Sequence, residues 1–497
     1  MRDTWRVAVG SAAVGLAVAV AAVAVTGPWD SGQRTAERVR AASWVQGGGP
    51  GHGGAGLPGG PAPAPSAPEV LTALGAAPGG GRAAGGDVAE GAGGDGAAPG
   101  RGEAPPPTRT ALTDTLEPLL EDGALGTLRT ASVVDVVTGR QLYGSNSGRA
   151  VVPASTVKVA TAVAALSAVG PEHRIPTRVV WEAERKRIFL VGGGDTTLTR
   201  AQLRRLADTT ARELAGRGVK EVSLAYDTSL YSGPERHPIG VNDNLAPVTP
   251  LMVEAGRLDD STHGPAPRSA DPAADAAGLF AERLRNRGVD VGAPVARRVP
   301  GRSGGGVEEL AVHRSAPLSE LVERMLADSD NDLAEALARQ TAIARGEPAS
   351  FEGVRRAVRD ELAGQGRRLH LKGVRFADGS GLDRADRVSA ELLTGLLALA
   401  ADPGRPELRP VLTGLPVARF TGTLGGRYDE EATRNGAGVV RAKTGTLTGV
   451  NTLAGTVVDA DGRLLAFAFT ASGTTDRQGA HAALDRLASA LANCGCR

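Results

Sequence analysis

Hydrophobic residues are distributed unevenly along the 497 residues of this chain. Residues 7–26 are small or apolar and carry no charge, a length that suits either a cleaved export signal or a retained membrane helix. Residues 47–107 are dominated by Gly, Pro and Ala, with too little apolar surface to offset the entropy of ordering. We therefore expect a signal peptide or membrane anchor at 1–27, a disordered tether at 28–107, and export of the remainder to the cell envelope, anchored or secreted.

From residue 108 onward, short runs of alternating apolar residues predict strands, and longer runs with helical spacing predict helices. The first two strands form a hairpin, and the last three form a meander before the final helix. The expected strands are 131–137, 141–143, 438–443, 451–458 and 464–470, and the expected helices are 155–168, 318–326, 333–344, 351–362 and 477–493.

The stretch from 177 to 315 differs in character from the sequence on either side. We interpret it as an inserted domain, or domains, of mainly β/α structure within one α/β (α+β) domain formed by 108–176 and 316–497. Its pattern contains a second hairpin (179–181 with 188–191), a helix around Leu203, Leu206 and Leu214, a strand near Val222, and a Pro/Gly-rich loop at 229–272.

The composition argues against several classes of function. The formal net charge is +1 and aromatic residues make up only 3% of the chain, so no nucleic-acid partner is expected. The seven histidines show no metal-ligand spacing, and we expect neither a metal nor a cofactor. The only two cysteines, Cys494 and Cys496, lie at the C-terminus. A disulfide between them and a disulfide to a partner are both compatible with the sequence.

Lysine is rare in this chain, and its positions carry the first chemical signal. Only five of the 56 Lys and Arg residues are lysine, and Lys158 follows Ser155 by three positions. On a helix this spacing places both side chains on one face, where the amine reaches the hydroxyl. A buried lysine can act as a general base, which an arginine cannot do. The pair indicates a serine nucleophile, the alternative being an exposed helical Ser and Lys.

A second lysine begins the motif Lys443-Thr444-Gly445, which lies in an expected strand. Strand alternation puts Lys443 and Gly445 on one face, so that the missing side chain of Gly445 leaves room for an extended substrate. We expect Lys443 and Thr444 to hold a carboxylate of that substrate. The alternative is an ordinary lysine at a strand end followed by a turn glycine.

A third motif, Ser329-Asp330-Asn331, falls between two expected helices, where it either projects into a cleft or forms a helix N-cap. Each motif occurs once, in the order Ser-x-x-Lys, Ser-x-Asn, Lys-Thr-Gly, and this set resembles the penicillin-binding and serine β-lactamase superfamily. The long insertion is similar to the class C low-molecular-mass penicillin-binding proteins, the D-alanyl-D-alanine carboxypeptidase/endopeptidase family. Other similar stretches lie at 192–198, 227–234 and 378–389.

The resemblance implies an antiparallel sheet flanked by helices and acyl transfer through Ser155. In this interpretation Ser155 attacks the carbonyl of the penultimate D-Ala, Lys158 is the general base, and Ser329 relays a proton to the leaving amine. Asn331 positions the lysine and the substrate amide. The backbone N–H groups of Ser155 and Thr446 hold the oxyanion.

The implied partners are the stem peptides of peptidoglycan and β-lactam antibiotics, which acylate the same serine. Carboxypeptidase and endopeptidase action both stay open, as does the oligomeric state. We expect the inserted residues to restrict which peptides reach the cleft. Two alternative functions remain: a serine β-lactamase-like hydrolase, and a non-catalytic protein that binds peptidoglycan or a partner.

Overall fold

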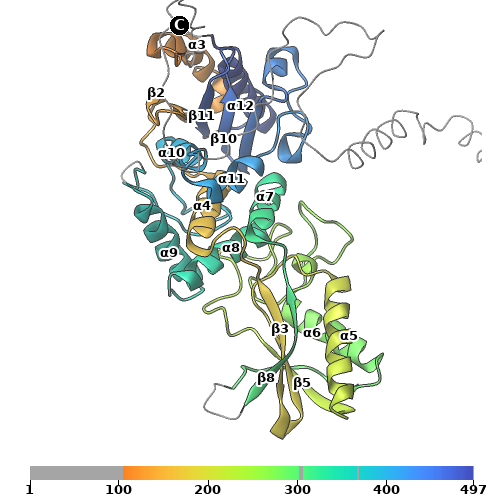
Figure 1. Ribbon diagram of the computed structural model, residues 1–497. Coiled ribbons are helices and arrows are strands. Elements are labelled where there is room, and N and C mark those ends of the chain that lie inside the picture. The colour runs from red at the N-terminus through yellow and green to blue at the C-terminus, as the bar shows by residue number, and fades with distance from the viewer. Residues whose placement is uncertain (1–104, 301–305, 367–368, 496–497) are drawn as a thin grey trace, which may run out of the picture. The chain divides into compact units, whose positions relative to one another are not determined.

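The computed structural model describes residues 105–300, 306–366 and 369–495 (Figure 1). The signal or anchor expected at 1–27, and the tether expected at 28–107 up to residue 104, lie outside the described residues. Within the described part, no helix combines the length and the apolar composition that crossing a membrane requires. Cys496 also lies outside it, whereas Cys494 is buried just after the end of helix α12 (Arg477–Ala492).

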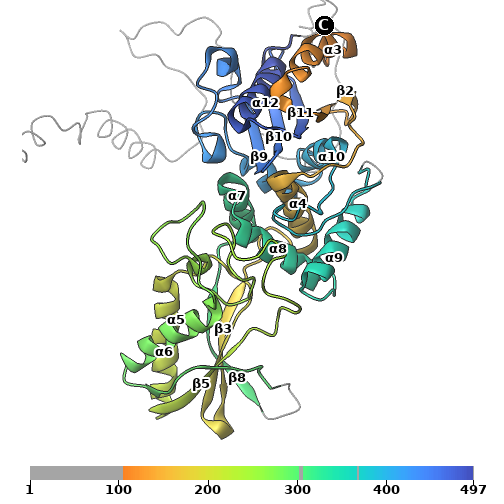
Figure 2. The ribbon, with the colours of Figure 1, turned by 180° about the vertical axis from the view of Figure 1, so that it is seen from behind.

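The first sheet is antiparallel and has the strand order β2-β1-β11-β10-β9. The hairpin of β1 and β2 and the meander of β9, β10 and β11 are both confirmed, and Figure 2 shows the last three strands side by side. The strands are β1 (Leu128–Asp135), β2 (Gln141–Ser145), β9 (Val440–Leu447), β10 (Val450–Val458) and β11 (Leu464–Ser472).

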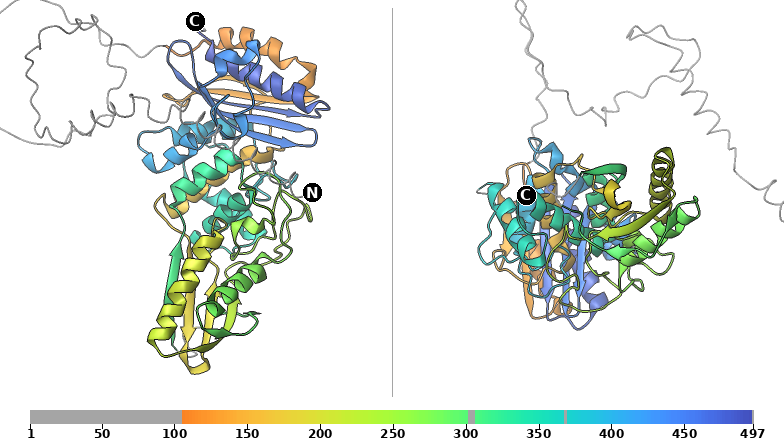
Figure 3. Two further views of the ribbon diagram at one scale, coloured as in Figure 1. Left: turned by 90° about the vertical axis from the view of Figure 1, so that its right-hand side faces the viewer. Right: turned by 90° about the horizontal axis from the view of Figure 1, so that it is seen from below.

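Both faces of this sheet are covered by helices, because its central strands are apolar at nearly every position. Along β1, Val133 contacts one hydrophobic core and Val134 the other, since successive side chains point to opposite faces. The left view of Figure 3 shows the two helical layers on opposite sides of the sheet. One layer contains α3 (Arg109–Leu120) and α12, and the other α4 (Lys158–Val169), α7 (Leu318–Asp328), α8 (Asn331–Ala344), α9 (Phe351–Gly364), α10 (Ala390–Ala400) and α11 (Arg409–Thr413).

The second sheet is built from residues between Pro176 and Arg314 and has the order β6-β5-β4-β3-β8, with β7 beside β5. Helices α5 (Arg200–Gly216) and α6 (Pro272–Arg285) pack against it around a separate core (Figure 1). Pro176 pairs with Arg314, so the chain enters and leaves this sheet at neighbouring positions. The strands are β3 (Pro176–Glu182), β4 (Arg187–Val191), β5 (Glu221–Asp227), β6 (Asp290–Val291), β7 (Val295–Ala296) and β8 (Val307–Arg314).

The expected mixed α/β fold is confirmed, but some of its elements differ from the sequence prediction. The expected helix at 155–168 is wrong at its start, because Ala154–Val157 form the 3-10 helix η2 and α4 begins only at Lys158. Among the described helices and strands, seven were missed: α3, α6, α10, α11, β6, β7 and β8. Helix α10 is apolar at most positions and packs against both the sheet and α4, so no polar stripe marks it as helical.

Candidate active site

Ser155 lies in η2, directly before α4. The preceding residue, Ala154, has a φ of +47°, a left-handed conformation that is strained for a residue with a Cβ. Gly381 packs against this turn so closely that a Cβ there would lie 2.1 Å from the carbonyl oxygen of Ala154. The turn holds the half-buried hydroxyl of Ser155 beside β9.

Lys158 is the first residue of α4 and is completely buried. Its Nζ lies 2.9 Å from Ser155 Oγ, 2.7 Å from Asn331 Oδ1 and 2.6 Å from the carbonyl oxygen of Ser380. Burial lowers the pKa of Lys158 to about 8, although the carboxylate of Asp378 opposes this shift. Near this pH a substantial fraction of the amine is unprotonated and able to accept a proton from Ser155.

The expected break between helices is present at Ser329, which ends α7 with a φ of +57°. Asp330 is the N-cap of α8, and its side chain accepts a hydrogen bond from the backbone N–H of Leu333, so the N-cap interpretation is correct for this residue. The two residues that flank it contact the lysines instead. Ser329 Oγ lies 2.9 Å from Lys443 Nζ, and Asn331 contacts the amine of α4.

Lys443 on β9 is as deeply buried as Lys158. Its Nζ donates to the carbonyl oxygen of Thr444 at 2.7 Å, in addition to the contact with Ser329. Burial, and then the positive charge of Lys158, lower the pKa of Lys443 well below its ordinary value. The two lysines are thus brought to the same site from different elements, each beside a serine hydroxyl.

The space beside Gly445 is filled, which differs from the expectation. A Cβ at this position would lie 2.2 Å from Thr452 Oγ1, 2.9 Å from the carbonyl oxygen of Pro153 and 3.0 Å from the backbone nitrogen of Ser155. The expectation that the missing side chain leaves room for substrate is wrong, because η2 and β10 fill that space. Glycine is required here by the close approach of β9 to the turn that carries Ser155.

A cleft of about 550 Å³ brings the expected residues together. Ser155, Ser329, Asn331, Thr444 and Thr446 line it, and the two lysine side chains lie buried behind this wall. The cleft can therefore present hydroxyl and amide groups to a peptide while both amines stay shielded from water.

Three further residues of this site were not singled out from the sequence. The carbonyl oxygen of Asn244 accepts a hydrogen bond from the Asn331 amide at 3.0 Å. His481 Nε2 lies 3.1 Å from Thr446 Oγ1, and burial lowers the pKa of His481 to about 4. Arg477, one turn before His481 on α12, lines the cleft and is exposed. These three lie outside any motif. Ser380 belongs to the similar stretch at 378–389, but it contributes a backbone carbonyl, which no side-chain pattern reveals.

The chain is similar in sequence to known carboxypeptidases over most of its length. Residues 112–267 and 260–493 match the D-Ala-D-Ala carboxypeptidase 3 (S13) family. A carboxypeptidase of Mycobacterium tuberculosis is 36% identical over 409 residues, which cover 78% of this chain and 85% of the relative. Carboxypeptidase DacB of Mycolicibacterium smegmatis is 37% identical over 412 residues, which cover 79% and 86%.

The fold is also found in a solved structure, that of penicillin binding protein 4 (dacB) from Haemophilus influenzae. The two share 24% sequence identity with a TM-score of 0.63, over 76% of this chain and 97% of that one. The resemblance to class C low-molecular-mass penicillin-binding proteins is thereby confirmed. The chain belongs to the D-Ala-D-Ala carboxypeptidase 3 (S13) family and is a serine-type D-Ala-D-Ala carboxypeptidase.

Proposed function

We propose that this carboxypeptidase acts outside the cytoplasm on peptidoglycan stem peptides by forming an acyl enzyme on Ser155. The observation that supports this most directly is the buried amine of Lys158, which lies 2.9 Å from Ser155 Oγ and has its pKa lowered to about 8. A hydroxyl beside an amine that can take its proton is an activated nucleophile. A protein that only bound peptides would bury this amine at a cost in stability without using it.

In the proposed acylation step, Ser155 Oγ bonds to the carbonyl carbon of the penultimate D-Ala and gives its proton to Lys158 Nζ. The carbonyl oxygen becomes an oxyanion, which the backbone N–H groups of Ser155 and Thr446 would stabilise. The close packing of Gly445 against the Ser155 nitrogen supports this assignment, because it keeps β9 next to the nucleophile. Asn331 Oδ1, 2.7 Å from Nζ, helps to aim the amine.

The leaving amine needs a proton when the peptide bond breaks. Ser329 is suited to relay it, since its hydroxyl lines the cleft and lies 2.9 Å from Lys443 Nζ. The proton held by Lys158 would pass through Ser329 to the nitrogen of the departing D-Ala, which keeps the electron pair of the broken bond. Water then attacks the acyl carbon, with Lys158 again as the base, and the Ser155 hydroxyl is restored.

The terminal carboxylate of the substrate is proposed to bind along the Thr444 and Thr446 hydroxyls, both of which line the cleft. Lys443 would contribute through its charge from behind this wall, because its Nζ already contacts Ser329 and a backbone carbonyl. The exposed guanidinium of Arg477 is a further cation, and it lines the cleft itself. Carboxypeptidase and endopeptidase action both cleave the bond after a D-Ala and differ in the leaving amine, so we propose that one site serves both.

β-Lactams are proposed to acylate Ser155, because they resemble the D-Ala-D-Ala end of the substrate. The structure of Haemophilus influenzae penicillin binding protein 4 in complex with a β-lactam supports this proposal by fold. A serine β-lactamase is the weaker alternative. Class A members use a glutamate for deacylation, and among the described residues that line this cleft there is no glutamate.

The inserted residues are proposed to restrict access to the cleft. In this proposal 177–315 form the inserted domain, and 108–176 with 316–497 form the peptidase domain. Asn244, Arg257 and Arg268 of the insertion line the cleft, where they would meet the acyl part of a stem peptide.

Export is proposed because the substrate lies outside the cytoplasm and because residues 7–26 have the composition of a signal peptide or a membrane anchor.

Release of D-alanine from a small peptide that ends in D-Ala-D-Ala tests the proposed function. We expect the wild type to release D-alanine and Ser155→Ala to lose at least about a thousandfold in kcat/KM, as is typical when a catalytic nucleophile is removed. Ser223→Ala changes an exposed serine on β5 and is the matched control, with unchanged activity expected. Equal activity of Ser155→Ala and wild type would refute the acyl-serine mechanism.

A further inference from the structure

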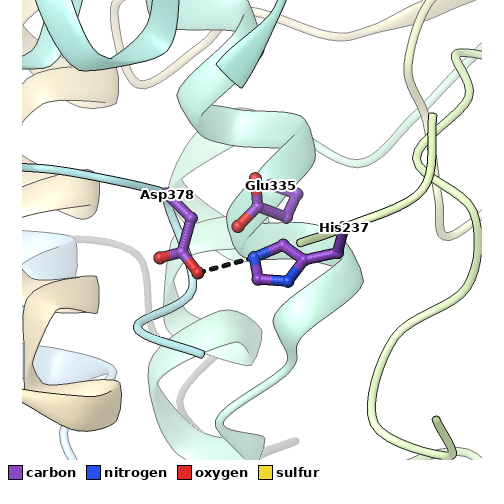
Figure 4. A group of neighbouring side chains, drawn as sticks. All are labelled: His237, Glu335 and Asp378. Carbon is purple, nitrogen blue, oxygen red and sulfur yellow. Dashed lines mark hydrogen bonds and ion pairs between the residues drawn. The ribbon is translucent and has the colours of Figure 1, made fainter. Parts of the chain in front are cut away.

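A buried group of polar side chains beside the cleft takes no part in the steps above. His237 comes from the Pro/Gly-rich loop at 229–272, Glu335 from α8, and Asp378 from the segment before α10. All three side chains are buried, and Figure 4 shows the imidazole pointing at the Asp378 carboxylate. His237 Nε2 lies 2.9 Å from Asp378 Oδ2.

The neighbours of His237 indicate where its proton resides. His237 Nδ1 accepts a hydrogen bond from the backbone N–H of Ile239 at 3.2 Å, which assigns the proton to Nε2, the atom that donates to Asp378. The Phe351 ring packs edge-on to the imidazole, with centroids 5.3 Å apart. His237 is therefore held as a hydrogen-bond donor of fixed orientation.

Asp378 connects His237 to its own loop. Asp378 Oδ1 accepts from the backbone N–H groups of Ser380 at 3.0 Å and Gly381 at 2.6 Å, and Oδ2 accepts from that of Asp383 at 2.8 Å. Burial alone would raise the pKa of Asp378, but the hydrogen bond from His237 and those from the backbone hold it at about 2. The carboxylate is therefore ionised, and its stability in the interior depends on these donors.

Glu335 holds the same loop from α8. Its Oε1 accepts from the backbone N–H groups of Gly379 and Ser380, both at 3.0 Å. The carbonyl oxygen of Ser380 is the group that lies 2.6 Å from Lys158 Nζ. The peptide groups that orient the lysine are thus fixed by two buried carboxylates. Among the described residues that donate to those carboxylates, His237 alone comes from between Pro176 and Arg314.

A metal site is the competing interpretation of this group. One ligand atom from each of His237, Glu335 and Asp378 lies within 4.8 Å of the others, a spacing that suits a bound cation. However, each carboxylate oxygen already accepts from a protein donor, including Arg339 Nη1 on Glu335 Oε2 at 2.9 Å. A cation would have to displace the donors that fix the loop, so the geometry favours a hydrogen-bonded support.

We propose that His237 is a positioning residue for Lys158, through which the inserted residues complete the active site. This rests on the proposed function, in which Lys158 is the general base for Ser155. Without the His237 donor, the buried and ionised Asp378 would lose one of the hydrogen bonds that stabilise its charge, which is costly enough to shift its loop. The Ser380 carbonyl would move with the loop, and misplacing a catalytic group by an ångström is sufficient to slow a reaction strongly.

Acylation of the full chain by benzylpenicillin, followed over a range of concentrations, separates initial affinity from the rate constant of the covalent step. We expect His237→Leu, which removes the donor at similar volume, to lower the covalent rate constant by about tenfold with little change in affinity. His237→Gln retains a donor near the position of Nε2 and is expected to recover most of the rate. The control is His370→Leu, at an exposed histidine 3.2 Å from Glu391, with wild-type behaviour expected.

Each rate is normalised to the number of sites that can be acylated, which removes any loss of folded protein. A wild-type rate in His237→Leu, or an equal loss in the Leu and Gln variants, would overturn the positioning role. Loss of acylation on chelation, with recovery on adding Zn²⁺, would overturn it in favour of a metal ion at this group. A wild-type chain that is never acylated would instead refute the proposed function itself.

Discussion

At the scale of single residues, the proposed chemistry depends on Lys158. Burial favours its neutral form, while the oxygens of Asn331 and Ser380 and the hydroxyl of Ser155 surround its nitrogen at 2.6–2.9 Å. The negative charges of Asp378 and of other carboxylates nearby oppose the effect of burial, which still lowers the pKa of Lys158 from an ordinary value of 10.5 to about 8. An amine so placed can both take and return a proton within one catalytic cycle.

The activity is expected to rise with pH through about 8. The neutral amine accepts the proton of Ser155, and the pKa of Lys158 is about 8, so below that pH the reactive fraction falls about tenfold per unit. The measurement is kcat/KM for D-alanine release from about pH 6 to about pH 10. Lys158→Arg keeps the charge without the base and should be inactive throughout, with Lys186→Arg at an exposed lysine as the control. A flat wild-type profile would contradict the assignment.

Side chains with distinctive chemistry were predictable from the sequence, but the groups that hold them in position were not. Lys158 and Lys443 stood out because lysine is rare and each lies in a short motif with a hydroxyl residue. The Ser380 contact is made by a backbone carbonyl, which every residue possesses. His237 lies in a loop without periodicity, so only the folded chain shows that it meets Asp378.

At the scale of elements, the decisive feature is the tight enclosure of η2. β9 approaches it from one side through Gly445, and the loop that holds Gly381 approaches it from the other. Both glycines lie where a Cβ would meet backbone atoms of the turn, and the turn itself contains the strained Ala154. The nucleophile is therefore fixed by close backbone packing on both sides of its turn.

Gly381→Ala tests this enclosure against a matched glycine. Gly381 and Gly462 have nearly equal φ values of +83° and +84°, but only at Gly381 would a Cβ meet other atoms within 4 Å. We expect the unfolding free energy to fall by about 1 kcal/mol in Gly462→Ala and by about 2–4 kcal/mol in Gly381→Ala, as measured by denaturant titration. The penicillin acylation rate should fall only in Gly381→Ala. Equal effects of the two changes would mean that η2 is not tightly enclosed.

Burial alone does not separate the elements that were predictable from those that were missed: α8, buried at most positions, was expected, whereas α6, with one buried face, was not. Helices α7 and α9 each have one apolar face and one charged face, and both were expected close to their observed bounds. Helix α6 begins at Pro272, where the expected Pro/Gly-rich loop ends, but no helix was predicted after that loop. β9 runs on to Leu447, so the Lys-Thr-Gly motif lies inside the strand and its last residues face η2.

At the scale of the whole molecule, a buried ion pair joins the residues between Pro176 and Arg314 to α8, beside the cleft. Arg268 Nη1 lies 2.7 Å from Asp332 Oδ2 on α8, with side chains 4% and 2% exposed. The backbone N–H of Ala246 donates to the other Asp332 oxygen at 2.9 Å. These contacts join the residues between Pro176 and Arg314 to the helix that begins with Asn331, and His237 joins them to Asp378 in the segment before α10.

Arg268→Met is expected to weaken this attachment in a pH-dependent way. Burial raises the pKa of Asp332 to about 7 despite the guanidinium, so the ionised carboxylate that needs Arg268 prevails above this pH. We expect a loss of about 3 kcal/mol in unfolding free energy near pH 8 and a smaller loss near pH 6, with Arg268→Met/Asp332→Asn recovering most of it. The control is Arg178→Met, which breaks an exposed ion pair with Glu309 and should have no measurable effect. A loss that is the same at both pH values would contradict this assignment.

A change of structure between Ser155 and Ser329 was predictable, because many residues separate the two serines and the sequence pattern changes between them. A second sheet is built from residues of this stretch. The contacts that attach this stretch to α8 were not predictable, because Arg268 and Asp332 are far apart in the sequence and neither belongs to a periodic pattern. Contacts of this kind depend on which loops meet in space, and a single sequence contains no signal for that.

The acyl enzyme on Ser155 is the central claim, and intact-protein mass after incubation with benzylpenicillin tests it most directly. We expect one penicilloyl adduct on the wild type and none on Ser155→Ala, because Oγ of this serine is the atom that lies beside the buried amine of Lys158. An adduct that persists in Ser155→Ala, or an unmodified wild type with intact antibiotic, would contradict the account. Hydrolysed antibiotic with no adduct would contradict a stable acyl enzyme and favour a β-lactamase.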